Sequence, residues 1–316
     1  MLENIQRLRL LGLPVFDNIE NLAALIRVDS KRLTILVLQS ERFYRTYRIP
    51  KRSSGWRKIS SPSKEIKAIQ AWILRNILDK LSPSAYATGY ILRKRLVDNV
   101  NPHASNRFFL SVDIRDFFPM IGSWRIRRLF EVLGYSEMAA VTLTRLCTYF
   151  GGLPQGGVTS PALSNLVCLK VDRRLGGLAS HRNMVFTRYA DDITFSTNNR
   201  NALCRVLTLV FEIIRNEGFE PNLEKVRLLG PRTQCRITGL VKNSSEARFG
   251  IGKKKKIRMR AVMHNLLVKG RHDSTYPDGA SIEGWLSFLK GVDPGSHEQM
   301  TRYWNTLKAK YGSKTR

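Results

Sequence analysis

The sequence has few cysteines and histidines, and no spacing that would join them in one site. Its four cysteines are far apart, and none of its five histidines stands at metal-ligand spacing from a cysteine or another histidine. The cysteines are Cys147, Cys168, Cys204 and Cys235. We therefore expect neither a structural zinc site nor a disulfide framework, and reduced thiols suit a cytoplasmic protein.

A hydrophobic run long enough to cross a membrane is also lacking. The longest uncharged stretch, residues 146–169, is interrupted by glycines and prolines. The first 16 residues carry Glu3, Arg7 and Arg9 inside an apolar run, which is unlike a signal peptide. The sequence therefore predicts no membrane partner.

Acidic residues are scarce relative to basic ones. The chain has 25 Asp and Glu against 53 Lys and Arg, a net charge of +28, and the basic residues are spread over the whole length. Excess charge of this size repels itself, and contacts with phosphate groups are the usual compensation. A solvated basic surface is the alternative, but the charge favours a nucleic-acid partner. At 316 residues the chain can form two or three sub-domains.

The hydrophobic patterns predict an α+β fold. In chain order we expect short helices over residues 18–40, a hairpin with strands at 43–49 and 56–61 around Ser53, Ser54 and Gly55, and an amphipathic helix from Ser63 to Ser82. A strand at 107–113, helices within 123–149, a helix at 161–177, a hairpin at 184–196, a helix at 200–217 and short strands within 225–241 follow. Residues 253–316 hold 14 basic and 5 acidic residues, which predicts a basic helical sub-domain.

The first segment that suggests chemistry is residues 108–119, FFLSVDIRDFFP. It reads as an apolar strand that ends by presenting Asp113, as a buried sheet presents catalytic groups at its edge. Asp113 is therefore a candidate metal ligand. The alternative is that Asp113 or Asp116 only caps the helix that follows.

The second segment, residues 185–196 (VFTRYADDITFS), reads as two strands joined by a tight turn that carries Asp191 and Asp192. Adjacent acids between apolar strands are unfavourable unless a cation neutralises them. Carboxylate oxygens suit Mg²⁺, and two ions roughly 3.5–4 Å apart could activate a 3′-hydroxyl and stabilise departing pyrophosphate. Because strand side chains alternate between faces, we expect Asp191 to matter more than Asp192.

The third segment, residues 153–165 (LPQGGVTSPALSN), reads as a flexible loop that enters a helix, with Ser160 as the cap and Pro161 in the first turn. Glycine in such a loop lets backbone approach a nucleotide closely. A purely structural turn is the alternative interpretation of this loop alone.

Taken in this order, the three segments resemble the palm motifs of reverse transcriptases. The chain looks most like the bacterial retron group, because it is compact and because residues 99–103 (NVNPH) and 237–239 (ITG) are similar to that group's NAxxH and VTG signatures. Val100 and Ile237 each depart from the signatures by one apolar residue. Val158 stands where the wider family commonly has proline.

The resemblance implies a right-hand polymerase fold. Residues 1–105 would form N-terminal helices and fingers with part of the palm, residues 106–245 the palm with the catalytic carboxylates, and residues 246–316 a basic helical thumb that binds RNA. Two Mg²⁺ ions would be held by Asp113, Asp191 and Asp192.

The resemblance also implies roles for other residues. Lys225, in the GFEPNLEK segment, would protonate the departing pyrophosphate, and Phe118 would lie against the sugar 2′ position and exclude ribonucleotides. Arg57 and Lys58 would steady the incoming dNTP, and Gln155 and Gly156 would shape its pocket. An ordinary surface lysine and a core phenylalanine are the alternatives for Lys225 and Phe118.

RNA contacts are expected from the two signatures and from the thumb. The expected residues are Asn99, His103, Thr238, Gly239, Lys253, Lys254, Lys255, Lys256, Arg258, Arg260 and Arg271. The thumb aromatics Trp285, Phe288, Tyr303 and Trp304 either stack on unpaired bases or form the core of the thumb.

The retron resemblance implies that the enzyme binds its own structured non-coding RNA and primes from a guanosine 2′-hydroxyl. It would copy part of that RNA into multicopy single-stranded DNA, a branched RNA–DNA hybrid, and act in anti-phage defence beside an effector protein. The alternatives are a reverse transcriptase of the group II intron or diversity-generating type, and an RNA-binding scaffold or antitoxin in which polymerisation is secondary.

Overall fold

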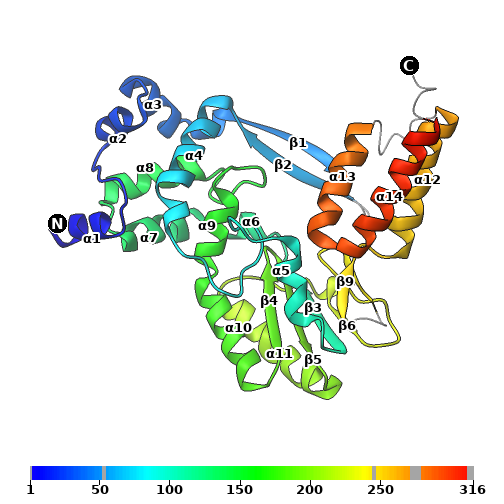
Figure 1. Ribbon diagram of the computed structural model, residues 1–316. Coiled ribbons are helices and arrows are strands. Elements are labelled where there is room, and N and C mark those ends of the chain that lie inside the picture. Colours follow the sequence, from blue (N-terminus) through cyan, green and yellow to red (C-terminus); the bar gives the residue numbers. More distant parts are fainter. Residues whose placement is uncertain (1, 52–54, 244–246, 271–278, 312–316) are drawn as a thin grey trace.

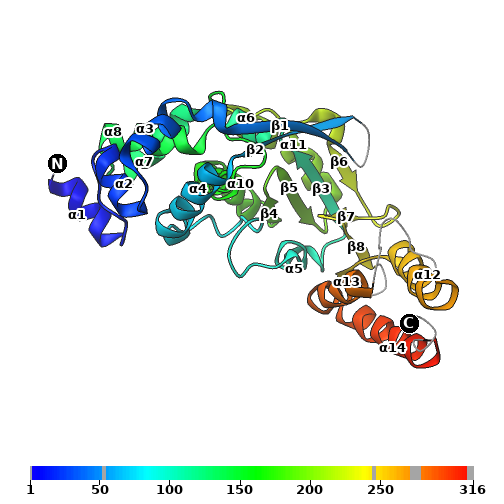
Figure 2. The same ribbon diagram turned by 90° about the horizontal axis from the view of Figure 1, so that it is seen from above.

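The computed structural model describes residues 2–51, 55–243, 247–270 and 279–311. Helices and three antiparallel sheets alternate along the chain, which confirms the expected α+β class. Figures 1 and 2 show the N-terminal helices at one end of the molecule, a central sheet, and three C-terminal helices at the other end. Among the described residues, no helix has the length and apolar character that a membrane crossing requires.

The N-terminal end is a helical lobe. It consists of α1 (Leu2–Leu10), α2 (Ile19–Ile26), α3 (Ser30–Leu38), α7 (Ser123–Leu133) and α8 (Glu137–Cys147). Asn18, Asp29 and Ser136 begin α2, α3 and α8 with side-chain oxygens that accept hydrogen bonds from backbone N–H groups of the first turn. Helix α1 packs against α7, and α3 packs against α8. The lobe therefore joins two segments that are far apart in the chain.

A two-stranded hairpin follows the lobe, as predicted. β1 (Tyr44–Pro50) and β2 (Trp56–Pro62) pair antiparallel, and most of their side chains are exposed. Figure 1 shows the hairpin extending from the N-terminal lobe toward α13. The predicted turn residues Ser53 and Ser54 lie outside the described residues.

The amphipathic helix α4 (Lys64–Asn76) begins after Ser63, whose Oγ accepts a hydrogen bond from the Ile66 N–H at 3.4 Å. The predicted cap is therefore confirmed, but the predicted end at Ser82 is wrong. The helix ends at Asn76 and a 3₁₀ turn (Leu78–Lys80) follows. Ile77 and Leu78 are buried and continue the apolar stripe, so the pattern concealed the break.

The central sheet has the strand order β4-β5-β3-β6. Its strands are β4 (Val185–Tyr189), β5 (Asp192–Thr197), β3 (Phe108–Asp113) and β6 (Arg227–Leu229). Helix α10 (Leu169–His181) packs on β4, and α11 (Arg200–Asn216) packs on β5 and β3. The sheet ends at the carboxylates described below.

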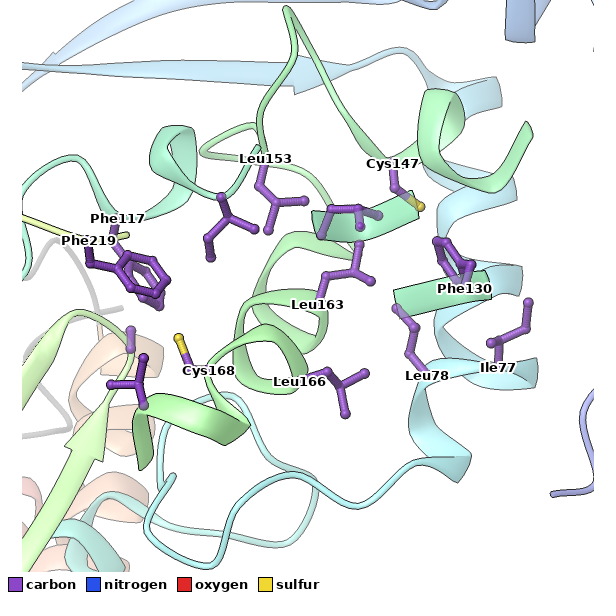
Figure 3. Packing of buried hydrophobic residues seen from close by; sticks show 14 of the residues in the cluster. Ile77, Leu78, Phe117, Phe130, Cys147, Leu153, Leu163, Leu166, Cys168 and Phe219 are labelled. Atoms are coloured by element: carbon purple, nitrogen blue, oxygen red, sulfur yellow. The ribbon is translucent and has the colours of Figure 1, made fainter. Parts of the chain in front are cut away.

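The main core joins this sheet to the N-terminal lobe through α9 (Ser160–Val167). Figure 3 shows Leu163 and Leu166 of α9 between Phe130 and Leu78 on one side and Phe117 and Phe219 on the other. The predicted single helix at 161–177 is two helices, α9 and α10, which meet at Cys168. Both helices are amphipathic and nearly contiguous, so periodicity did not separate them.

The C-terminal end comprises a small sheet and a helical bundle. Its elements are β7 (Arg236–Ile237), β8 (Leu240–Asn243), β9 (Arg248–Gly250), α12 (Lys253–Lys269), α13 (Gly279–Val292) and α14 (Pro294–Tyr311). Their core also includes Phe109 of β3 and Val97 and Val100 of the short helix α5 (Leu96–Val100). The thumb therefore shares its core with the central sheet.

Candidate active site

The central sheet brings the three predicted acids together at one edge. Asp113 is the last residue of β3, and Asp192, the first residue of β5, lies opposite it in the antiparallel register. Side chains opposed in this way share one face of the sheet. Asp191 lies in the turn between β4 and β5, where its carbonyl accepts a hydrogen bond from the Ile114 N–H at 3.0 Å.

Burial and mutual repulsion raise the pKa values of two of these carboxyls. For Asp191, burial is the larger cause and the charge of Asp113 comes next, while Lys225 and Arg57 lower the pKa. For Asp192, burial followed by the charges of Asp191 and Asp113 raises the pKa to about 6. A bound cation would relieve this concentration of negative charge.

Lys225 contacts the same site from the 3₁₀ turn Leu223–Lys225. Its Nζ lies 2.9 Å from Oδ1 of Asp113 in an ion pair, and the lysine side chain is about half exposed. Asn222 supports the pair, because its backbone N–H donates to the Asp113 carbonyl at 2.7 Å and its Nδ2 lies 3.4 Å from Asp113 Oδ1. The structure thus brings Lys225 to the carboxylates, as expected.

A buried ion pair holds the turn that carries Asp191. The guanidinium of Arg188, the residue before Tyr189, donates to both carboxylate oxygens of Asp172 on α10. It also donates to Asn165 Oδ1 at 3.2 Å and to the Ala190 carbonyl at 3.1 Å. Ala190 has φ 56°, a left-handed conformation that is uncommon for a residue with a side chain. The network therefore holds the turn at Ala190 in this unfavourable conformation.

The sequence patterns did not assign this network. A signal was present, because Asp172 stands on the apolar stripe of its helix between Cys168 and Leu175. An acid in such a position requires a buried partner.

The glycine loop lies against the fingers hairpin. The Gln155 carbonyl accepts a hydrogen bond from the Ser60 N–H of β2 at 2.9 Å. Gly156 has φ 127°, and a side chain there would meet the Ser60 carbonyl at 3.0 Å, so glycine permits this approach. The predicted helix cap at Ser160 is wrong, because Ser160 is the first helical residue. Its Oγ donates to the Pro154 carbonyl at 2.8 Å.

Gln70 of α4, another residue that the patterns did not assign, ties the loop to the fingers. Its side chain is fully buried. Its Nε2 donates to Tyr44 Oη at 2.9 Å and to the Leu146 carbonyl at 2.8 Å, and its Oε1 accepts from the Val158 N–H at 2.9 Å. This contact restrains the loop at Val158, where proline is common in the wider family.

The two fingers residues differ in their relation to the carboxylates. Arg57 is exposed and close enough to Asp191 for its charge to lower the pKa of that carboxyl. Lys58 is also exposed but lies on the opposite face of the hairpin, because neighbouring strand residues alternate. Phe118 is partly buried on α6 (Phe117–Met120), with its ring 5.3 Å from that of Phe117.

The side chains of Asn99 and His103 are buried and already hydrogen-bonded within the protein. The ring nitrogens of His103 lie 2.6 Å from Ser196 Oγ and 2.8 Å from Thr187 Oγ1, and burial lowers the pKa of this histidine to about 3. Neither side chain faces solvent where RNA would bind. These two side chains of the NVNPH segment therefore stabilise the interior of the protein.

Thr238 and Gly239 form the two-residue turn between β7 and β8, with φ values of 44° and 85°. A β-branched residue rarely adopts this conformation, so the turn is strained at Thr238. Asn99 Nδ2 lies 3.3 Å from Thr238 Oγ1, and Lys255 Nζ lies 3.3 Å from the Gly239 carbonyl. The two retron-like segments therefore contact each other, and the thumb joins them.

The basic thumb residues are only partly available. Lys253 and Lys254 are exposed at the start of α12, whereas Lys256 lies 3.5 Å from Asp293 Oδ2 and Arg260 stacks over Tyr303 at 4.7 Å. Arg258 is exposed, and Arg271 lies outside the described residues.

Among the thumb aromatics, Trp304 is 3% exposed and belongs to the core. Trp285 and Tyr303 pack partly against this core, and Phe288 is 46% exposed. The core interpretation therefore fits Trp304 best and Phe288 least.

Within the described ranges, the Asp, Glu, His and Cys side chains as they stand form no group of three that could hold a metal ion. The four cysteines all lie in these ranges and are free thiols. Enzymes with a reverse transcriptase domain generally use divalent metal ions.

Comparison with known proteins identifies the family. Residues 49–242 match the family model described as reverse transcriptase (RNA-dependent DNA polymerase). The chain is 37% identical over 311 residues to the retron Ec86 reverse transcriptase of Escherichia coli, which covers 98% of this chain and 95% of that protein. It is 34% identical over 313 residues to the retron Mx65 reverse transcriptase of Myxococcus xanthus, covering 92% and 72% of the two chains.

The fold is also similar to that of a solved telomerase from Candida albicans, in complex with a fragment of telomeric RNA. The TM-score is 0.51 at 14% identity, and the match covers 85% of this chain and 56% of the telomerase chain. This likeness supports the right-hand polymerase fold. The sequence matches show that the chain belongs to the retron reverse transcriptases and is an RNA-directed DNA polymerase.

Proposed function

We propose that this enzyme copies part of its own structured non-coding RNA into single-stranded DNA by metal-dependent nucleotidyl transfer. The observation that carries the proposal is the convergence of Asp113, Asp191 and Asp192 at one edge of the sheet, with Lys225 in contact with Asp113. Burial and neighbouring carboxylates raise the pKa values of Asp191 and Asp192, and a group of acids in such a site is a suitable donor set for divalent cations.

Two Mg²⁺ ions are the proposed cofactors, with Asp113, Asp191 and Asp192 as their ligands. The donor set fits, because all three side chains offer hard oxygen ligands and burial of Asp191 and Asp192 favours neutralisation of their charge. When bound, such ions activate the attacking hydroxyl and stabilise the leaving phosphate oxygens. Lys225 would have to exchange its contact with Asp113 for one with the phosphates.

The chain's own residues have distinct proposed tasks around the incoming dNTP. Arg57 neutralises the triphosphate from the hairpin, and Lys225 donates a proton to the departing pyrophosphate. The loop at Gln155 and Gly156 shapes the nucleotide pocket between palm and fingers. Phe118, which is only partly buried, lies against the sugar and excludes a 2′-hydroxyl.

The cognate non-coding RNA is proposed to bind the thumb and the strained turn at Thr238 and Gly239. Lys253 and Lys254 supply exposed positive charge beside this turn, and Lys255 links the turn to α12. The similarity to retron enzymes supports priming from a guanosine 2′-hydroxyl and a branched product of RNA joined to multicopy single-stranded DNA. A role in anti-phage defence beside an effector protein, in the cytoplasm, belongs to the same proposal.

The test is to purify the protein from cells that express the chain with its neighbouring non-coding RNA, and to size the bound nucleic acid on a denaturing gel before and after RNase treatment. A DNA that RNase shortens but does not remove is expected. Asp191→Asn should abolish this DNA, whereas Asp79→Asn, at an exposed acid on the 3₁₀ turn after α4, should leave it unchanged.

Two outcomes would contradict the proposal, one from this gel and one from a phage challenge of cells that carry Asp191→Asn. If the purified DNA carries no covalently joined RNA, priming from a 2′-hydroxyl is wrong, and a reverse transcriptase of the group II intron or diversity-generating type is favoured. If Asp191→Asn abolishes DNA synthesis but cells keep full phage resistance, the chain acts as an RNA-binding scaffold.

A further inference from the structure

A cavity of about 740 Å³ lies in the N-terminal lobe, away from the carboxylates. Its walls come from the end of α3 and the 3₁₀ turn that follows, from the first turn of α7, from α8, and from the segment that leads to the glycine loop. No residue assigned to the proposed chemistry lines it. We refer to this cavity as the lobe groove.

Two large aromatic side chains line the lobe groove and are exposed to solvent. Trp124, at the start of α7, is 68% exposed, and Phe150, after α8, is 70% exposed. Phe150 also has φ 46°, a conformation that is unfavourable for a residue with a side chain. Its ring contacts that of Tyr149 at 4.6 Å, and the guanidinium of Arg125 lies 5.2 Å from the Trp124 ring. The exposed parts of the two rings offer stacking surfaces for unpaired bases.

The groove also carries excess positive charge. Arg42, Arg127 and Arg145 line it, against Glu41 as the acidic residue of the lining. Arg127 is occupied by ion pairs with acidic residues of its own lobe. Arg145 is exposed and forms no ion pair within the described ranges, so its charge is available to a phosphate group.

The segment that lines the groove leads directly into the glycine loop. The Ser123 N–H, next to Trp124, donates to the Gly151 carbonyl at 2.8 Å, and the Leu153 N–H donates to the Ile121 carbonyl at 3.2 Å. Two residues beyond Leu153, Gln155 bonds to the fingers hairpin. The groove lining at Phe150 and Gly151 is therefore continuous in the chain with the loop that contacts the fingers hairpin.

The groove and the thumb lie at opposite ends of the molecule. Figures 1 and 2 show α3, α7 and α8 on one side of the central sheet and α12 to α14 on the other. If newly made duplex lies toward the thumb, the template that has not yet been copied must approach from the opposite side. That side holds the lobe groove.

We propose that the lobe groove binds unpaired RNA template just before it enters the active site, by stacking bases on Trp124 and Phe150 and by pairing a phosphate with Arg145. This inference rests on the proposed function, because it assumes that the carboxylates copy RNA. It assigns a single-strand binding site to a lobe that is otherwise remote from catalysis.

The test compares primer–template duplexes whose RNA template has an unpaired 5′ extension of one uridine, of eight uridines, or of one uridine followed by seven abasic sugars. The full-length protein should bind the eight-uridine extension at least about fivefold more tightly than the short one, as one stacked base would provide. The abasic extension should lose most of this gain, because it keeps the phosphates but has no bases to stack.

The double variant Trp124→Ala, Phe150→Ala should lose the preference for the eight-uridine extension, and Trp124→Phe should keep most of it. Arg145→Gln should weaken binding of the uridine and abasic extensions alike. Arg128→Gln, at an exposed arginine of α7 outside the groove lining, is the matched control and should change neither. Incorporation of one nucleotide on the short template should be unchanged in all these variants.

The inference is overturned if the parent protein binds the three extensions equally, if abasic and uridine extensions bind alike, or if the double variant retains the preference with its melting temperature unchanged. These outcomes are separate from failure of the proposed function. If the proposed function is wrong, the parent protein adds no nucleotide to any template, whatever its affinity for the extension.

Discussion

The guanidinium of Arg188 donates to both carboxylate oxygens of Asp172, at 2.6 and 2.7 Å, and neither side chain has any exposed surface. The pair connects α10 to the strand that leads directly into the catalytic turn. A buried pair of this kind contributes little net stability compared with apolar residues, but loss of one partner leaves an unneutralised charge in the core. Its value here lies in the position that it gives to Asp191.

Substitution of Arg188 should therefore affect folding and catalysis separately. Arg188→Met should destabilise the protein by roughly 3–5 kcal/mol, because Asp172 is left buried without its partner. The double variant Arg188→Met, Asp172→Leu should recover most of that stability but still synthesise DNA slowly, because Ala190 has lost its hydrogen bond. Urea unfolding and primer extension measure the two effects, and full activity in the double variant would contradict the positioning role.

The raised pKa of Asp192 predicts how stability depends on pH. Its pKa of about 6 in the folded state exceeds the ordinary value of 3.8, so the folded protein holds a proton that the unfolded chain releases. Stability from this group is therefore present below about pH 4 and is lost as pH rises through 6. In metal-free buffer, Asp192→Asn should be more stable than the parent by about 1–3 kcal/mol above pH 6.5, with no difference near pH 4.

The same variant should be inactive, because it lacks one carboxylate of the site. Adding Mg²⁺ should raise the melting temperature of the parent at pH 7.5 and have little effect on Asp192→Asn. A variant that is less stable than the parent at pH 7.5 would show that Asp192 is satisfied by protein contacts alone.

Lys225→Gln should slow nucleotide incorporation on the order of 100-fold, the usual contribution of a general acid. Because Lys225 lowers the pKa of Asp191, the variant should also shift the acidic limb of the pH–rate profile to higher pH. Single-turnover extension across pH 6–9 measures both effects. Lys170→Gln, which removes another exposed lysine from an ion pair, is the control and should leave the profile unchanged.

A double-mutant cycle tests the contact between the two retron-like segments. Asn99→Ala should weaken binding of the cognate RNA indirectly, because it removes the hydrogen bond that supports the turn at Thr238. Thr238→Ala should weaken it as well, and the second substitution should add little to the first, with a coupling of about 0.5–1.5 kcal/mol. Filter binding or fluorescence anisotropy gives the affinities. Fully additive effects would mean that Asn99 and Thr238 act on RNA independently.

Binding of RNA should weaken steeply as salt concentration rises, because many phosphates are neutralised together. Lys253→Gln, Lys254→Gln should reduce the slope of log affinity against log salt by about 1–2, since each contact with a single strand contributes roughly 0.7. Lys31→Gln, at an exposed lysine of α3, should leave the slope unchanged. A slope that the double variant does not alter would exclude these lysines from the RNA interface.

The sequence predicted the strands and turn that carry the three acids well, because these elements are local. Short segments of the sequence contain the pattern of each element. These elements are the strand that ends in Asp113, the hairpin turn with Asp191 and Asp192, and the start of the helix after Ser63. Convergence of the acids then follows from pairing of β3 with β5.

The contacts that hold this edge in place are not local, and the patterns did not reveal them. Arg188 meets Asp172 across two elements, and Gln70 reaches Val158 over 88 positions. Asn99 and His103 were expected to contact RNA because they belong to a segment similar to the retron NAxxH signature, but both are buried among hydrogen-bond partners. Only the folded chain supplies those partners.

The strand that presents Asp113 at one end inserts Phe109 into the thumb core near its other end, where the ring packs edge-on against Phe249 at 6.3 Å. Only three residues separate the two positions, so the thumb is not a clamp that swings independently of the palm. Any displacement of α12 to α14 relative to the palm would disturb the packing of Phe109, which belongs to the same strand as Asp113. We therefore expect the binding of RNA by the thumb to be coupled to the position of Asp113.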